Sequence, residues 1–153
     1  MRFFLFSVLL SFLSCHNKPN PSAEEKATRN LLQQERKAHF DRNTDLFLSE
    51  FSDSMISVTK GEILKASVEQ RRKKIEDYFN SVEFIKWDDM TEPQVCFSDD
   101  GSLAYAIVQK EVILGNKYDS SKHSTDTTNF AWVSIYKKEK GIWKLQCNIS
   151  TNK

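Results

Sequence analysis

The 153-residue sequence lacks the features of several common functional classes. It has three cysteines, at widely separated positions, and therefore no paired-cysteine metal site. Its 22 Lys and Arg residues nearly balance its 21 Asp and Glu residues, which leaves no overall electrostatic footprint for nucleic acid. Neither a phosphate-binding loop nor a nucleophile elbow is present. What remains is a chain long enough for one ordinary globular domain.

A single long apolar run lies at the N-terminus. It extends from Phe3 to Leu13, is interrupted only by Ser7 and Ser11, and follows the basic residue Arg2. As a helix rising ~1.5 Å per residue, it would cross about half of the hydrocarbon thickness of a membrane. This pattern is typical of the core of a signal peptide.

The end of this run, Phe12-Leu13-Ser14-Cys15, resembles the lipobox of bacterial lipoproteins. The resemblance implies a signal peptide over residues 1–14 and lipidation of Cys15, followed by a tether over residues 15–23. His16, which is not the Asp associated with inner-membrane retention, favours the outer membrane. We therefore expect a lipoprotein of the bacterial cell envelope that contacts the membrane through its N-terminal lipid.

Residues 24–153 are expected to form the folded domain. Apolar spacing predicts a helix from Glu24 to Phe40 and a short helix capped by Asn43 or Thr44. Ser67 and Gln70 have the spacing of a capping box, which predicts a third helix with Val68, Ile75 and Phe79 on its buried side. The β-rich runs that surround or follow these helices are Met55–Val58, Val82–Trp87, Val95–Ser98, Leu103–Leu114, Thr128–Lys137 and Ile142–Ile149. Helices followed by an antiparallel meander indicate the α+β class.

The order of short motifs in this domain is similar to that of the nuclear transport factor 2-like superfamily, especially its SnoaL-like branch. The motifs are Asp45-Leu46-Phe47, Phe51-Ser52-Asp53, Val58 with Gly61, Trp87-Asp88-Asp89, Asp99 to Tyr105, and Gly141 to Leu145. The resemblance implies a curved antiparallel β-sheet wrapped around the N-terminal helices, forming a cone with a pocket, and often a homodimer paired through the sheet. Related isomerases, dehydratases and cyclases use carboxylates, histidines and tyrosines in the pocket, whereas other relatives only bind ligands or partners.

Two residues are candidates for acid–base chemistry. His39, near the end of the first helix, has an ordinary pKa close to neutrality and could border the pocket. Asp45 could act as a base, although an acidic residue in the first turn of a helix also has an ordinary stabilising role there. The resemblance to SnoaL-like enzymes, many of which carry a histidine on the last strand after the tryptophan, implies a histidine there. In this sequence alternation places Cys147 and Ile149, and no histidine, on the face of Trp143, which counts against histidine catalysis.

Four aromatic residues are candidates for lining the pocket. Tyr78, Trp87, Tyr105 and Trp132 combine a large apolar ring with a polar tip. Binding sites are mostly apolar with few polar groups, so such rings suit a cavity wall. The alternative is that they are simply core residues of the sheet.

Two further groups of charged or metal-ligating residue types are not predicted to be binding sites. The basic run from Arg71 to Lys74 is flanked at four-residue spacing by acidic residues, which favours a solvated helix face over a nucleic-acid site. Asp119, His123 and Asp126 lie in a Ser/Thr-rich stretch without metal-ligand spacing, so no metal site is expected. No motif calls for a cofactor.

These observations support a lipid-anchored domain that binds a small apolar molecule or another envelope protein without turning it over. The alternative is a cofactor-free isomerase, dehydratase or cyclase that uses Asp45, His39 and a tyrosine such as Tyr105. A purely structural homodimer with a filled cone is a third hypothesis.

Overall fold

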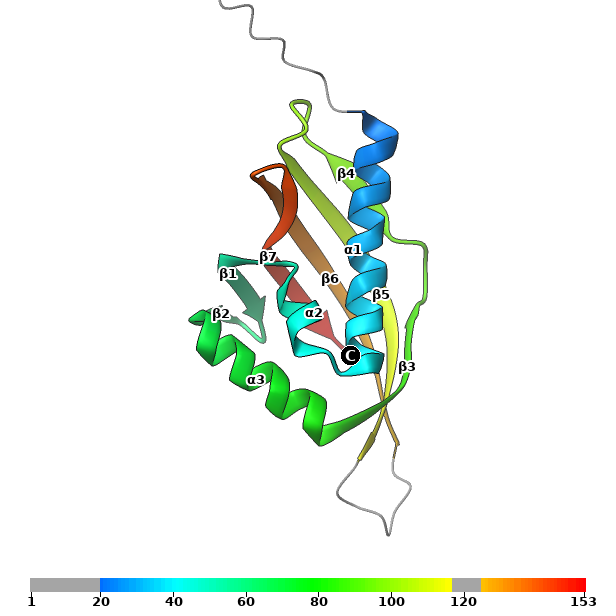
Figure 1. Ribbon diagram of the computed structural model, residues 1–153. Coiled ribbons are helices and arrows are strands. Elements are labelled where there is room, and N and C mark those ends of the chain that lie inside the picture. Colours follow the sequence, from blue (N-terminus) through cyan, green and yellow to red (C-terminus); the bar gives the residue numbers. More distant parts are fainter. Residues whose placement is uncertain (1–19, 117–124) are drawn as a thin grey trace, which may run out of the picture.

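A computed structural model describes residues 20–116 and 125–153 of the chain. The helices precede most of the sheet in the sequence and cover one of its faces (Figure 1). The elements are α1 (Pro21–Asp41), α2 (Thr44–Leu48), β1 (Phe51–Thr59), β2 (Glu62–Lys65), α3 (Val68–Ser81), β3 (Val82–Asp89), β4 (Gln94–Phe97), β5 (Leu103–Asn116), β6 (Thr125–Glu139) and β7 (Ile142–Asn152). The predicted α+β class is confirmed.

Helix α1 begins three residues before the predicted start at Glu24. The Asn20 side chain accepts a hydrogen bond from the backbone N–H of Ser22, and Pro21 occupies the first turn, where its missing N–H costs nothing. Residues 21–23 of the predicted tether therefore belong to this helix. Within the described residues, no helix combines the length and the apolar character needed to cross a membrane.

The other two helices begin at the predicted caps. Asn43 accepts a hydrogen bond from the backbone N–H of Leu46 at 2.9 Å, and Ser67 and Gln70 form the complete capping box. The prediction that Val68 is buried is wrong, because its side chain is 42% exposed. Helical side chains lean toward the N-terminus, so this first-turn residue points past the end of the packed face. Arg71 and Phe79 are the buried residues of α3.

The sheet has the order β2-β1-β7-β6-β5-β3, and β4 also pairs with β5. Strands β5, β6 and β7 form the predicted antiparallel meander, while β1 lies parallel to β7. The sheet curves around the helices without closing, which gives the expected cone-shaped fold (Figure 1). The main core lies between the helices and the concave face, where Ala104, Ala106 and Val108 of β5 are almost fully buried.

A β-bulge in β7 changes which side chains face the interior. Leu145 pairs with Tyr136 but Cys147 pairs with the preceding residue, Ile135, so Gln146 is the extra residue. Alternation therefore reverses beyond Gln146. The predicted inward placement of Cys147 and Ile149 is wrong: both lie on the outer face, and Asn148 takes the inward position opposite Ser134.

Candidate functional site

A cavity of about 280 Å³ lies between the helices and the concave face of the sheet. The exposed surface of its walls is mainly aromatic and aliphatic, and polar and charged side chains lie among the apolar ones. The lining residues are Glu35, His39, Phe47, Glu50, Phe51, Met55, Ser57, Leu64, Ala66, Arg71, Lys74, Ile75, Trp87, Phe130, Trp132, Ser134, Tyr136, Leu145 and Asn148. Lys74 is an exposed residue of α3, so the cavity reaches the molecular surface beside that helix.

Glu50 is a buried acid in this cavity. It lies between α2 and β1, where its backbone carbonyl accepts a 2.7 Å hydrogen bond from the N–H of Leu145. Its side chain is only 4% exposed, and its Oε1 has no hydrogen-bond partner among the described residues. Burial, reinforced by the nearby Glu35 charge, raises the pKa of Glu50 to about 9. Glu50 is therefore protonated at neutral pH.

Glu35 lines the same cavity from α1. Burial raises the pKa of Glu35 to about 7, the Lys110 charge opposes this rise, and the Asp89 charge adds to it. Lys110 is itself buried and donates to Asp89 at 2.5 Å. Glu35 thus changes charge near neutral pH, close to a second carboxyl group that stays neutral there.

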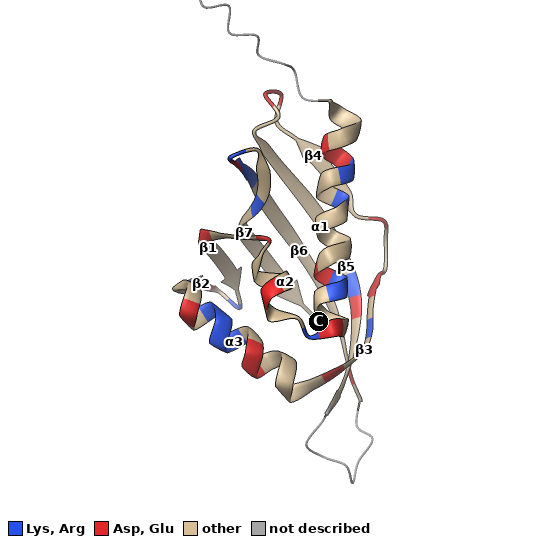
Figure 2. Cartoon of the chain, in the orientation of Figure 1, with Lys and Arg blue, Asp and Glu red and all other residues tan. Residues whose placement is uncertain are grey.

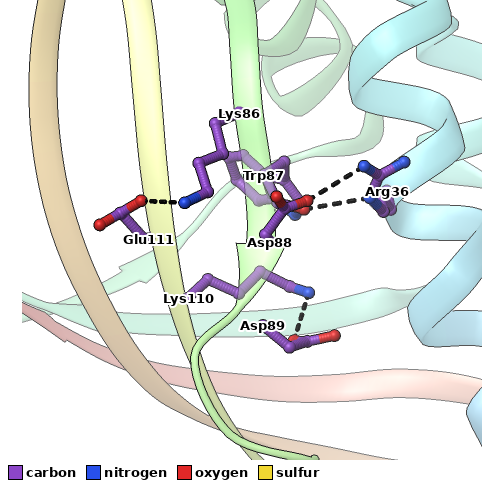
Figure 3. A network of polar contacts seen from close by, with 7 residues as sticks. All are labelled: Arg36, Lys86, Trp87, Asp88, Asp89, Lys110 and Glu111. Atoms are coloured by element: carbon purple, nitrogen blue, oxygen red, sulfur yellow. Dashed lines mark hydrogen bonds and ion pairs between the residues drawn. The ribbon is translucent and has the colours of Figure 1, made fainter.

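An ion-pair network beside Glu35 joins α1 to strands β3 and β5 (Figure 3). Arg36 donates to the backbone carbonyl of Trp87 at 3.1 Å and to Asp88 at 3.0 Å. These bonds tie the strand that carries Trp87 to the helix that carries Glu35. The network therefore holds two walls of the cavity together.

His39 lies one helical turn after Glu35 and is buried. Its Nδ1 is 2.7 Å from the backbone carbonyl oxygen of Glu35, which can only accept, so Nδ1 carries the proton and Nε2 is unprotonated. The ring stacks on Trp87, with centroids 3.7 Å apart. Burial is the main cause that lowers the pKa of His39 to about 4, so the expectation of a pKa near neutrality is wrong. His39 is a neutral wall residue and a weak base.

Asp45 does not share the cavity with His39. Its side chain is 82% exposed and forms a 2.8 Å ion pair with Arg72 of α3. It occupies the first turn of α2, the ordinary position that the sequence also allowed. The structure therefore does not bring the predicted catalytic pair together.

The four aromatic candidates occupy different places. Trp87 and Trp132 line the cavity. Tyr78 packs its ring 6.5 Å from that of His39 and is not a lining residue, and burial raises its pKa to about 12. Tyr105 lies on the outer face of the sheet, 38% exposed and opposite Cys96. Alternation in β5 could have indicated that Tyr105 does not line the cavity. Its neighbours Ala104 and Ala106 are buried on the inner face, so Tyr105 must point to the opposite face.

The polar residues of the cavity that sequence reasoning missed include Glu35, Glu50, Tyr136 and Asn148. Glu35 carries a recognisable signal, since it precedes His39 by four positions and shares its helix face. Asn148 donates to Ser134 Oγ at 3.2 Å, but the bulge conceals its inward direction from any alternation argument. Nothing in the local sequence distinguishes Glu50 from a surface acid.

The basic run of α3 has two roles. Arg71 is buried and donates to the backbone carbonyls of Ser52 at 3.1 Å and Ala66 at 3.2 Å, so it is a structural residue rather than a solvated one. The other predicted pairs are partly confirmed, because Arg72 pairs with Glu76 and Lys73 with Asp77. Mixed charges along α3 are visible in Figure 2.

Cys15, the predicted lipidation site, lies outside the described residues, as do Asp119 and His123, for which no metal site was predicted. Within the described ranges, no group of three or more His, Cys, Asp or Glu side chains is arranged to hold a metal ion.

The sequence matches no family model and no curated protein, but the fold has many solved relatives. LinA aligns with a TM-score of 0.70 and 13% identity over 87% of this chain and 88% of its own. A proposed dehydratase of the NTF2-like family from Streptomyces avermitilis aligns with a TM-score of 0.70 and 12% identity over 86% and 97%. A ketosteroid isomerase-like protein from Erwinia carotovora atroseptica aligns with a TM-score of 0.66 and 11% identity over 84% and 95%. At these identities the similarity establishes the NTF2-like fold alone.

Proposed function

We propose that this protein is a lipid-anchored domain of the bacterial envelope that binds a small, mainly apolar molecule in its cavity. The observation that carries the proposal is the cavity of about 280 Å³ with predominantly aromatic and aliphatic walls. A cavity of ~150 Å³ accommodates benzene, so this one has room for a compound of one or two rings. The envelope location rests on the N-terminal 15 residues and their resemblance to a lipoprotein signal.

A second candidate function is cofactor-free proton transfer, as in an isomerase, dehydratase or cyclase. It is favoured by one specific observation, that Glu35 and Glu50 share the cavity with pKa values of about 7 and about 9. A base that titrates near the working pH and an acid that remains protonated are the two groups that such a reaction needs. In this alternative Glu35 is the base and Glu50 the acid, in place of Asp45 and His39.

The experiment that tests the binding function is a thermal-shift screen with hydrophobic metabolites. A ligand at 100 times its Kd stabilises the folded state by ~2.7 kcal/mol, which gives a readily measured rise in Tm. Substituting Ser134→Leu in the cavity wall should remove the rise, whereas Asp77→Asn on the exposed face of α3 should preserve it. A screen in which no compound raises Tm would contradict the binding function.

The same binders distinguish the two candidate functions. Each is incubated with the native protein, with Glu35→Gln and with Asp45→Asn as the matched surface control. We expect the compound to be recovered unchanged in all three samples. Conversion by the native protein and by Asp45→Asn, but not by Glu35→Gln, would replace the binding function with the enzymatic one.

A further inference from the structure

Three buried side-chain atoms in the described part of the chain have no hydrogen-bond partner, and all belong to cavity residues. They are Glu50 Oε1, Trp87 Nε1 and Trp132 Nε1. Buried polar atoms are nearly always paired, because an unpaired one loses its hydration without compensation. The concentration of these unpaired atoms around one cavity indicates that they share a partner that enters it.

The chemistry of these atoms defines the partner. An indole N–H can donate a hydrogen bond but cannot accept one. Glu50 is excluded from solvent and forms none of the described ion pairs, so burial keeps it in its uncharged form and makes its carboxyl group a donor as well. Both indoles therefore require an acceptor, such as a carbonyl or ether oxygen, and the same oxygen can accept a hydrogen bond from the hydroxyl group of the uncharged Glu50.

Charged ligands fit this set less well. An organic cation would leave both indole N–H groups without an acceptor. An anion would meet the two carboxyl groups of Glu35 and Glu50. Of the two cations in the wall, Lys74 is exposed, and the buried Arg71 already donates to backbone carbonyls of β1 and of Ala66. The cavity thus disfavours both cationic and anionic ligands.

We propose that the ligand is an uncharged ring compound with a carbonyl or ether oxygen, which accepts hydrogen bonds from Glu50 and from the indoles of Trp87 and Trp132. This inference rests on the binding function proposed above and specifies its ligand class. The apolar walls hold the ring skeleton, and the three donors fix the oxygen. The cavity then selects a ligand by the position of its oxygen as well as by the size of its apolar skeleton.

The test uses four bicyclic probes of similar size, measured by titration calorimetry at pH 7. They are 1-tetralone, which carries a carbonyl, the hydrocarbon tetralin, the anion 1-naphthoate and the cation 1-aminotetralin. One net hydrogen bond predicts that 1-tetralone binds roughly 5- to 10-fold more tightly than tetralin. Both charged probes should bind more weakly than tetralin.

Two substitutions of Glu50 separate the donor from the shape of the side chain. Glu50→Met removes the donor and should make the affinities for 1-tetralone and tetralin equal, with tetralin binding retained. Glu50→Gln keeps an N–H donor and should preserve the preference. Trp132→Phe should reduce the preference, and Asp77→Asn on the surface of α3 should leave every affinity unchanged.

The outcomes distinguish this inference from the function on which it rests. Equal affinities of the native protein for 1-tetralone and tetralin, or a preference for either charged probe, would overturn the ligand class and leave the binding function intact. If none of the four probes binds at millimolar concentration, the binding function fails and the ligand class fails with it.

Discussion

Glu50 shows most clearly how the tertiary structure sets the chemistry of one residue. Its backbone is fixed between α2 and β1 by the hydrogen bond from Leu145, so its side chain points inward although carboxyl groups favour solvent. Lys110 is also buried, but it is paired with Asp89. An acid held neutral in a cavity, with one carboxyl oxygen lacking a hydrogen-bond partner among the described residues, is a candidate functional position.

The raised pKa of Glu50 predicts how stability depends on pH. The pKa rises from 4.5 in the unfolded chain to about 9 in the folded protein, so between these values the folded state holds a proton that the unfolded state releases. The stabilisation is therefore complete below pH 4.5 and is lost as the pH rises through about 9. Between pH 7 and 9 we expect the free energy of unfolding to fall by up to ~1.4 kcal/mol per pH unit.

Urea unfolding at pH 6, 7, 8 and 9 measures this effect. The neighbouring shifts lie below the window, because Glu35 has its pKa at about 7 and His39, with a shift of opposite sign, at about 4. Glu50→Gln should flatten the profile above pH 7. Glu35→Gln removes a charge that helps to raise the pKa of Glu50, so its profile should still fall above pH 7 but level off at a lower pH than the native profile. Parallel profiles for the native protein and Glu50→Gln would contradict the assignment.

At the scale of elements, the bulge in β7 decides which polar group enters the cavity. If β7 were a regular strand through Gln146, alternation from Leu145 would direct Cys147 inward and Asn148 outward. The bulge reverses this choice and places an amide, rather than a thiol, opposite Ser134. The register shift at Gln146 therefore decides the chemistry of this part of the site.

Thiol labelling tests the reversal. In a Cys147→Ser background, a thiol introduced by Asn148→Cys should be protected from labelling when a cavity ligand such as 1-tetralone is bound. The native Cys147, on the outer face, should be labelled at the same rate with and without ligand. Ligand protection of Cys147 instead would show that the strand has no bulge.

The strand order also predicts the redox state of two cysteines. Cys96 and Cys147 lie in one cross-strand row through Tyr105 and Ile135, and both are free thiols in the structure. Three strand steps of ~4.8 Å separate them by ~14 Å, whereas a disulfide needs Cα atoms within ~7 Å. Mass measurement after alkylation of the denatured, unreduced protein should find both modified. Finding neither modified would mean that the strand order is wrong.

At the scale of the whole molecule, the two faces of the sheet differ in what they present. The concave face carries the cavity, and the outer face exposes Tyr105 and Ile107 of β5 and Ile149 of β7, with Ile107 and Ile149 in one cross-strand row through Val133 of β6. Adjacent exposed apolar residues on a sheet are typical of an interaction surface. We propose that a second copy of the chain pairs with this face.

Sedimentation measurements test the pairing. The double substitution Ile107→Glu and Ile149→Glu places charge on the outer face and should convert a dimer into a monomer without loss of the folded signal. Ile142→Glu, at the exposed start of β7, is the matched control and should remain dimeric. A native protein that sediments as a monomer would contradict this proposal.

The proposed location in the bacterial envelope rests on the predicted lipidation of Cys15. Lipidation at this residue predicts that radiolabelled fatty acid is incorporated into the native protein in bacterial cells. Cys15→Ala should abolish both the incorporation and the processing of the N-terminal segment. Equal labelling of the two proteins would show that the lipobox resemblance is misleading.

The sequence by itself determined the elements whose signals are local. Asn43 and the Ser67–Gln70 capping box place two helix starts, because a cap involves residues only a few positions apart. The period-two pattern placed the strands of the meander, and the motif order indicated the cone. The start of α1 was missed by three residues because the capping residue Asn20 precedes a segment with no apolar pattern.

Only the tertiary structure decided the composition of the site. Glu35 of α1, Glu50 before β1 and Asn148 of β7 come together because three separate elements pack around one cavity. The raised pKa values of Glu35 and Glu50 depend on burial by residues distant in the chain. The inward direction of Asn148 depends on a register shift between two strands. Asp45 has the residue type suited to a base but lies in water, since the same packing leaves the first turn of α2 exposed. Residue type is local, whereas burial and register are set by long-range contacts, and it is these that select the groups facing a ligand.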